Sequence, residues 1–260
     1  MTDSEKPVDF EPIENEYTFY LANTDETERQ LAAFGRHLDG IALPADRPLR
    51  FLDFGCSTGA FTGHFLTRAG WPPDRLEIAL VEPVEDQRRR AAAALASFTT
   101  RPIAHWPALP DDQVAGFDLM VSNFVIPYVR DLMATLGQLL AARAPGGLLL
   151  AANAGTKNAL YGLVELGFRS IGQQVPYHLT EQMAAALDQL GAPYEIEPVP
   201  HRVSFPDSEA NRLKLIRFLM TDTFAQIDPA PLVRFFDRFA ENGRIEIDTV
   251  CEHFVIRADG

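Results

Sequence analysis

The sequence predicts an α/β protein with a mostly parallel sheet that helices cover on both faces. Short apolar runs typical of buried strands alternate with amphipathic helical segments, which is the pattern of successive strand–helix–strand units. With 260 residues, of which 47% are hydrophobic, the chain is long enough to bury a large core. We expect an α/β domain over residues 46–260, preceded by a lid or cap segment at 1–45 and carrying a helical insertion at about 205–242.

The elements follow one another in a regular order. A first helix is expected after the capping residues Asn23, Thr24 and Asp25, ending near Gly40. The strands expected next are 50–54, 76–81, 102–106, 117–122 and 147–152. Three helices are expected between these strands. The first ends near Arg68, the second spans about 86–97 and the third spans 130–143. The expected elements after residue 154 are helices at about 158–170, 180–190, 208–220 and 230–240, a strand near 195–203 and a last strand at 248–258.

The charge balance excludes some classes of partner. A formal net charge of −13 repels phosphate backbones, so we expect no nucleic-acid partner and favour a small neutral or cationic ligand. No apolar run approaches the ~20 residues of a membrane-spanning helix, and the acidic start lacks the apolar core of a signal peptide. The two cysteines, Cys56 and Cys251, and the six histidines have no metal-ligand spacing. We expect a cytoplasmic monomer or homodimer without membrane contact or metal.

The segment 51–62 predicts a cofactor site. A strand runs into Asp53, Gly55 and Gly59 flank a tight turn, and a helix begins whose free N–H groups can face a polar ligand. The match to the dinucleotide fingerprint G-x-G-x-x-G is poor because Ser57 takes the middle position. A pyrophosphate would be repelled by Asp53, whereas a cationic amino group would be attracted.

Glu82 adds a second acid at the end of the next expected strand. A carboxylate there can accept two hydrogen bonds from ribose hydroxyls. The expected ligand has a cationic head near Asp53 and a ribose at Glu82, and S-adenosyl-L-methionine meets both conditions. For either feature alone, a packing turn or a strand-end cap is an equally good interpretation. Ligands in such sheets lie at the carboxyl ends of the strands, so Asn123 is expected to hydrogen-bond the ligand and Phe124 to wall it, unless both serve the core.

Four segments carry a family resemblance. LDFGCSTGAFT, LVEP, FDLMVSNFVIPYV and APGGLLLAANAG resemble the successive motifs of class I S-adenosylmethionine-dependent methyltransferases over about residues 50–155. The resemblance implies a Rossmann-like fold with a seven-stranded sheet whose last strand is antiparallel. Ser57 stands where the first motif has its middle glycine.

A narrower resemblance is to small-molecule enzymes of the histamine N-methyltransferase type. VEPVEDQ resembles a segment of that group and implies that Gln87 joins Glu82 in binding the cofactor. NTDETERQ resembles its substrate-lid segment and implies that Glu28 faces the amine of the substrate, although an acid there also favours the helix dipole. Aromatic residues at the positions of Tyr161 and Tyr177 line the substrate pocket in that group.

Further candidates come from position in the chain. Tyr17, Phe19 and Tyr20 could form an aromatic lid or a hydrophobic staple for the first helix. The predicted substrate-binding side chains are Tyr20, Glu28, Tyr128, Tyr161, Tyr177 and Ser204. The predicted catalytic side chains are Tyr177, His178 and Asn123. A base matters only if the acceptor arrives protonated, and a solvated turn histidine is the other interpretation of His178.

Three functional hypotheses follow. The first is transfer of a methyl group from S-adenosyl-L-methionine to a small molecule, an amine or similar nucleophile. The second keeps the cofactor but uses its aminobutyl arm, which would cyclise to a cyclic amino acid and release methylthioadenosine. The third is a non-catalytic cofactor-binding partner protein, with the helical insertion as its interface.

Overall fold

The computed structural model describes residues 13–110 and 115–258, so the start of the expected cap segment lies outside the described residues. The chain forms two compact units, which we describe separately. The first unit comprises the described residues up to 29 together with 154–177 and 198–251. The second unit comprises residues 30–153, 178–197 and 252–258. The chain therefore enters and leaves each unit more than once.

The sheet follows the order β3-β2-β1-β4-β5-β8-β6. Its strands are β1 (Leu49–Phe54), β2 (Leu76–Val81), β3 (Ala104–Trp106), β4 (Phe117–Asn123), β5 (Arg143–Asn153), β6 (Tyr194–Pro206) and β8 (Arg244–Arg257). β1 to β5 pair in parallel, while β8 pairs antiparallel with β5. A two-residue strand, β7 (Ala240–Glu241), also pairs with β8, which gives eight strands among the described residues. The expected parallel sheet with an antiparallel last strand is confirmed.

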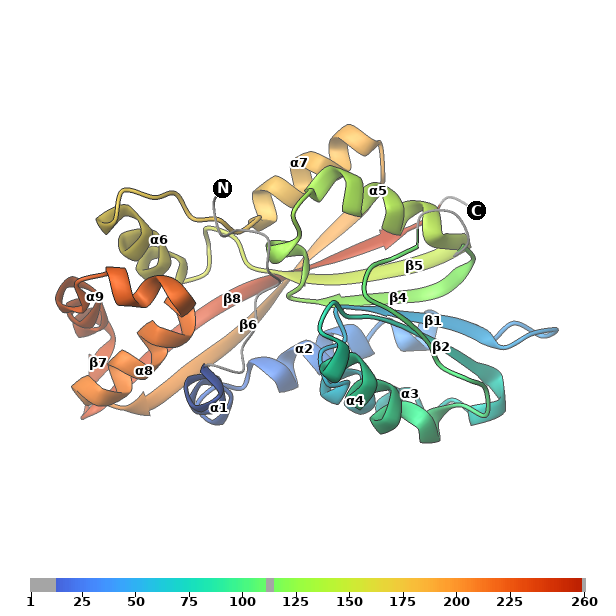
Figure 1. The fold of residues 1–260 in the computed structure, drawn as a ribbon, viewed down its shortest axis with the longest axis horizontal. Helices are drawn as coiled ribbons and strands as arrows, with labels where there is room; N and C mark the ends of the chain where they lie inside the picture. The colour runs from blue at the N-terminus through green and yellow to red at the C-terminus, as the bar shows by residue number, and fades with distance from the viewer. Residues whose placement is uncertain (1–12, 111–114, 259–260) are drawn as a thin grey trace. The chain divides into compact units, whose positions relative to one another are not determined.

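Helices cover both faces of the sheet in the second unit (Figure 1). Helices α3 (Ala60–Ala69) and α4 (Glu85–Leu95) lie on one face, and α5 (Leu132–Ala142) and α7 (Thr180–Leu190) lie on the other. β1 is buried on both faces because Phe51 packs with α3 and Leu52 packs toward α5. This explains why apolar residues face both sides of the sheet along β1, although the strand also carries Arg50 and Asp53.

Local sequence fixes where these helices begin and end. Asp131 caps α5 by accepting a hydrogen bond from the Ala134 N–H at 2.9 Å. Gly70 ends α3 in the left-handed conformation, with φ of 62°. Short 3-10 turns connect the main elements: 38–40, 73–75, 96–98, 126–128, 221–226 and 236–239. No helix in the described part of the chain has the length and apolar character needed to cross a membrane.

The first unit packs helices against the remaining parts of β6 and β8. Its helices are α1 (Glu14–Ala22), α6 (Tyr161–Ser170), α8 (Glu209–Met220) and α9 (Pro229–Phe235), and it contains the first residues of α2 (Glu26–Gly35). Its core is aromatic, with Phe19 edge-on to Phe205 and Tyr20 stacked on Phe218. The helices expected at 208–220 and 230–240 correspond to α8 and α9.

Helix α1 was not expected from the sequence. The apolar side chains of its segment, Tyr17, Phe19, Tyr20 and Leu21, lie all round the helix and make no single stripe, so periodicity gave no helical signal. The helix expected to end near Gly40 also ends earlier, because α2 stops at Gly35 and a separate 3-10 turn covers 38–40.

Candidate functional site

The turn after β1 has three residues with positive φ, a backbone conformation that needs support from neighbouring groups. Gly55 and Gly59 have φ of 88° and 81°, and Ser57 between them has φ of 47° although it carries a side chain. A non-glycine residue in the left-handed region costs free energy and is concentrated at functional sites. The Ser57 N–H donates to Oε2 of Glu82 at 3.1 Å, and this bond holds the strained turn in place.

Glu82 ties the ends of two neighbouring strands together. Its side chain is buried, and its other oxygen, Oε1, accepts from the Val84 N–H at 2.9 Å. The Ser57 hydroxyl donates to Oε1 of Gln87 at 3.3 Å. The structure therefore brings together three predicted cofactor residues, Ser57, Glu82 and Gln87. Each carboxylate oxygen has a second lone pair, which remains available to a hydroxyl of a ligand.

Asp53 lies at the end of β1 and is 4% exposed. It accepts a hydrogen bond from the hydroxyl of Thr62, a residue that the sequence analysis did not select although it stands in the same motif. Burial raises the pKa of Asp53 to about 7, the Thr62 hydrogen bond opposes this rise, and the charge of Glu82 adds to it. A cation beside Asp53 would restore its charged form.

The loop after β4 offers an unsatisfied acceptor. Oδ1 of Asn123 is buried and has no hydrogen-bond partner, which is uncommon for a buried polar atom. Phe124 beside it has φ of 57°, so both this loop and the β1 turn contain a strained non-glycine residue. The two loops touch, because a Cβ added to Gly55 would lie 2.1 Å from Cγ2 of Val125.

These residues fit a nucleoside with a cationic head. The second unit presents two buried acids, an unpaired amide oxygen and a left-handed turn at the carboxyl ends of β1, β2 and β4. Gly59 has a second role, since its Cβ would lie only 3.1 Å from Cα of Ala91 in α4. Packing of α4 therefore explains part of the glycine pattern.

His178 lies in the second unit and holds the loop after β4. Its Nε2 is 2.9 Å from the carbonyl of Val129, and its backbone N–H donates to the carbonyl of Pro127 at 2.9 Å. The Asn153 amide in turn donates to the His178 carbonyl at 3.2 Å. Since a bond to a carbonyl requires a proton on Nε2, the basic nitrogen of this ring is Nδ1.

Tyr177 belongs to the first unit, although it precedes His178 in the chain. Its ring lies edge-on to Phe168 with centroids 6.0 Å apart. Burial raises the pKa of Tyr177, and a hydrogen bond with Thr221 opposes the rise. A raised pKa makes the phenol a weaker acid, so the phenolate form that could act as a base is disfavoured at neutral pH.

Five of the six predicted substrate-binding residues lie in the first unit, and Tyr128 lies in the second. Tyr20 is buried, and its hydroxyl donates to Oε2 of Glu26 at 3.0 Å. Ser204 donates to Glu246 at 2.7 Å and accepts from Arg244. The remaining members are placed as follows: Glu28 on the exposed side of α2, Tyr161 at the first position of α6 and Tyr128 exposed at the end of a 3-10 turn.

Glu26 is the acid that the fold buries on this segment. Burial raises the pKa of Glu26 to about 7, the Tyr20 hydrogen bond opposes this rise, and the charge of Asp25 adds to it. The sequence offered two first-turn acids, Glu26 and Glu28, and no signal that distinguished them. Contacts from β6, distant in sequence, decide which one is buried.

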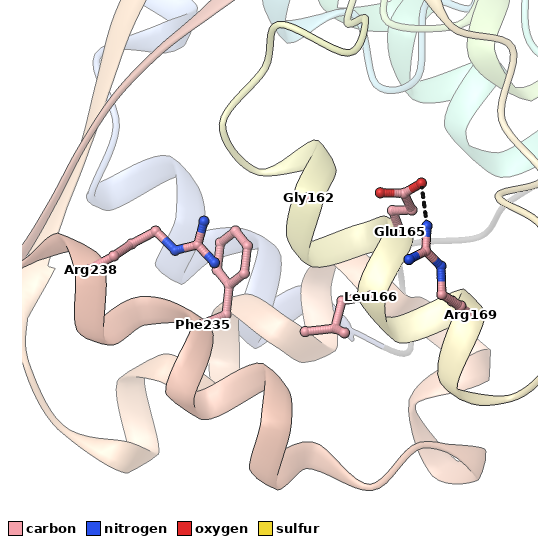
Figure 2. Close-up of a pocket in the computed structure, with 6 residues that line it drawn as sticks. All are labelled: Gly162, Glu165, Leu166, Arg169, Phe235 and Arg238. Atoms are coloured by element: carbon pink, nitrogen blue, oxygen red, sulfur yellow. Dashed lines mark hydrogen bonds and ion pairs between the residues drawn. The ribbon is translucent and has the colours of Figure 1, made fainter.

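A separate hollow of about 270 Å³ lies between α6 and the end of α9 in the first unit (Figure 2). It is lined by Gly162, Glu165, Leu166, Arg169, Phe235 and Arg238. Both arginines are engaged: Arg169 pairs with Glu165 at 2.9 Å, and Arg238 lies 4.1 Å above the Phe235 ring. None of these six residues was predicted to bind cofactor or substrate, so we do not place the functional site here.

The fold and the strand-end acids define a Rossmann-like α/β protein of the class I methyltransferase architecture. The chain belongs to the methyltransferase domain family, which it matches over residues 25–191, more than half of its length. The expectation of a methyltransferase fold is confirmed at this level, and the family agrees with S-adenosyl-L-methionine as cofactor.

Individual relatives are more distant. The trans-aconitate 2-methyltransferase of Rhodopseudomonas palustris (strain BisA53) is 32% identical over 106 residues, which are 40% of this chain and 38% of that protein. The match thus spans about two fifths of the curated relative. The YcgJ protein of Bacillus subtilis shares the fold with a TM-score of 0.55 and 13% identity, covering 87% of this chain and 97% of that one. The plantazolicin methyltransferase BpumL, solved with S-adenosylhomocysteine, shares the fold with a TM-score of 0.53 and 11% identity. That match covers 94% of this chain and 89% of BpumL.

Proposed function

We propose that the protein binds S-adenosyl-L-methionine at the carboxyl ends of β1, β2 and β4 and transfers its methyl group to a small molecule. The observation that carries this proposal is the connected set Ser57–Glu82–Gln87, in which a strained turn is tied to a buried strand-end acid. Membership of the methyltransferase domain family supports the reaction class. The complex of BpumL with S-adenosylhomocysteine supports the cofactor.

The residues of this chain divide the binding task. Glu82 accepts hydrogen bonds from the ribose hydroxyls, and Asp53 attracts the cationic amino group. Oδ1 of Asn123 has no hydrogen-bond partner among the described residues, and it accepts a hydrogen bond from the bound cofactor. The bound cofactor supplies an activated methyl group, so the protein has to align the acceptor and exclude water. In enzymes, alignment of this kind can supply up to ~7–11 kcal/mol.

We propose an amine as the acceptor, as in the histamine N-methyltransferase-like group. The predicted substrate-binding set contains the acid Glu28 and four tyrosines but no cationic side chain. Aromatic rings and acids attract ammonium groups, and the net charge of −13 favours cations over a polycarboxylate. The curated relative is named for trans-aconitate, a carboxylate acceptor. A protonated amine must lose a proton before it attacks, and Nδ1 of His178 is the candidate base.

Product analysis tests the reaction. The purified protein is incubated with S-adenosyl-L-methionine alone, with a panel of small amines and with tricarboxylic acids, and the nucleoside product is identified by mass spectrometry. We expect S-adenosylhomocysteine to form only when an amine is present. S-adenosylhomocysteine formed only with the tricarboxylic acids would overturn the amine assignment and keep the methyl transfer.

Two other outcomes contradict methyl transfer itself. Methylthioadenosine formed without any acceptor would mean that the aminobutyl arm reacts. Tight cofactor binding with no product from any acceptor would favour a non-catalytic partner protein. A Glu82→Gln variant serves as the control, because turnover that survives unchanged in this variant would place the reaction elsewhere.

A further inference from the structure

Three distant segments bring a glutamate, a histidine and a cysteine together inside the first unit. Glu26 begins α2, His201 lies in β6 and Cys251 lies in β8. One ligand atom from each lies within 4.8 Å of the other two. His201 and Cys251 are buried, and the Glu26 side chain is only 14% exposed. This cluster is separate from the strand-end site of the second unit, and the proposed function does not use it.

Two electron-rich atoms face each other in this cluster. Nδ1 of His201 is 3.4 Å from the carbonyl of Val199, so a proton on Nδ1 has an acceptor. The opposite nitrogen, Nε2, is buried and has no hydrogen-bond partner. It lies 3.3 Å from Oε1 of Glu26. With the proton on Nδ1, the lone pairs of Nε2 and Oε1 meet, and a cation between them is what would stabilise this arrangement.

The surroundings of the cluster are those of a metal site. Ligating histidines usually donate their other N–H to a backbone carbonyl, as His201 can do toward Val199. Ligating carboxylates are themselves hydrogen-bonded, and Oε2 of Glu26 accepts from the Tyr20 hydroxyl at 3.0 Å, which leaves Oε1 directed at His201. A distance of 3.3 Å between nitrogen and oxygen matches two ligands that each lie about 2.0 Å from one tetrahedral ion.

We propose that Glu26, His201 and Cys251 bind a zinc ion, with a water molecule as the fourth ligand. Sulfur, imidazole and carboxylate ligands together suit zinc better than magnesium or calcium. The Cys251 thiol now donates to the Val199 carbonyl at 3.6 Å and lies 3.9 Å from Nδ1 of His201. On binding, its sulfur loses the proton to solvent and turns toward the Nε2 side, forming the zinc–sulfur bond.

The competing explanation needs no metal. A proton shared between Glu26 and Nε2 of His201 would also relieve the contact between the two lone pairs. The protein would then bury a polar pair joined by a hydrogen bond and would have no preference for zinc over magnesium. The two explanations therefore differ in metal content and metal selectivity.

Metal analysis of the 260-residue wild-type chain tests the proposal. The protein is purified, treated with a chelator, shown to be folded by circular dichroism and titrated with zinc. We expect close to one tightly bound zinc per chain, a rise in Tm with zinc but not with magnesium, and a thiolate charge-transfer band when cobalt replaces zinc. A folded wild-type protein that binds no zinc would overturn the proposal, whatever its activity.

Matched variants locate the site. Cys251→Ser and His201→Gln are expected to lose the stoichiometric zinc and the zinc-dependent rise in Tm. Cys56→Ser changes the other of the two cysteines, which lies in the β1 turn of the second unit, and is expected to keep both. Full zinc binding in folded Cys251→Ser, or loss of zinc in Cys56→Ser, would refute the assignment. Because the readout is metal content and not turnover, this test is independent of the proposed methyl transfer.

Discussion

At the scale of single residues, Glu82 makes the most specific prediction. A Glu82→Gln variant keeps one carbonyl oxygen, so either the Ser57 or the Val84 N–H must face an amide NH₂ group. The variant also loses the charged acceptor of the ribose hydroxyls, and a hydrogen bond to a charged group contributes ~1.5–3 kcal/mol, so we expect S-adenosylhomocysteine to bind about 10- to 100-fold more weakly. Isothermal titration calorimetry measures the change.

Glu85→Gln is the matched control for this measurement. Glu85 begins α4 and its side chain is 71% exposed, so the same chemical change there should leave the affinity within about twofold. Equal affinities for the two variants would show that the bound nucleoside does not depend on the carboxylate of Glu82.

Asp53 predicts a pH dependence of stability. Its pKa is raised to about 7, so the folded protein holds this proton to a higher pH than the unfolded chain does. Its contribution is fully present below the unfolded pKa near 4 and is lost as the pH rises through 7, at on the order of 1.4 kcal/mol per pH unit. Asparagine does not titrate, so we expect an Asp53→Asn variant without cofactor to lack this loss of folding stability between pH 5 and about 8.

Urea unfolding at several pH values checks the Asp53 prediction. The free energy of unfolding of the wild type should fall relative to that of Asp53→Asn as the pH rises. Asp74→Asn, at an exposed position of the same unit, should follow the wild type. Parallel curves for the wild type and Asp53→Asn would mean that Asp53 is already ionised at pH 5.

The sequence identified some side chains of the candidate site and missed others for a physical reason. Ser57 and Glu82 were predictable because they stand in the turn and at the strand end that a cofactor site needs, whereas Gln87 was predicted only from the family resemblance of VEPVEDQ. Thr62 stands inside the recognised motif, but only the packing of α3 shows that it reaches Asp53. The cluster of Glu26, His201 and Cys251 has no signal in one dimension, because the pairing of distant segments creates it.

At the scale of elements, Gly59 and Gly70 at the two ends of α3 form a natural pair of test positions. Both have positive φ, but a Cβ on Gly59 would meet Cα of Ala91, whereas a Cβ on Gly70 would meet nothing within 4 Å. Alanine should cost about 1 kcal/mol at Gly70 from backbone strain alone. At Gly59 we expect a larger loss, about 2–3 kcal/mol, because α4 must move.

Denaturant unfolding of the two alanine variants measures this difference. If Gly59→Ala and Gly70→Ala lose equal stability, the close approach of α3 and α4 is not what requires glycine in the cofactor turn. A Gly59→Ala variant that unfolds like the wild type would remove the strain argument as well.

The elements themselves were predictable to different degrees. The central parallel strands β1, β2 and β4 were predictable, because burial on two sides makes most of their residues apolar. The ends of the parallel strands differ from expectation mostly by a few residues, and the largest difference is the earlier start of β5 at Arg143. α1 was not predictable, because its apolar side chains are held by aromatic partners such as Phe218 that lie far along the chain. A helix shows an apolar period of 3.6 residues when only one of its faces is buried. The apolar side chains of α1 lie all round the helix, so its sequence lacks this period.

At the scale of the whole molecule, the net charge of −13 predicts a difference between substrate and product. S-adenosyl-L-methionine carries a net positive charge and S-adenosylhomocysteine carries none. Raising the salt concentration from 0.05 to 0.5 M should weaken binding of the former by several-fold and leave the latter nearly unchanged. Calorimetric titrations of both nucleosides at each salt concentration give the comparison. Identical salt dependences would show that the field of the protein does not reach the site.

The path of the chain also sets the order in which the protein can fold. The edge of β5 over 148–153 is paired with residues 252–257 of β8, which the ribosome adds about 100 residues after β5. Until then the strand presents unpaired N–H and C=O groups, which is the surface from which edge-to-edge aggregation starts. Nascent chains that stall before β8 should therefore depend on chaperones far more than chains that include β8.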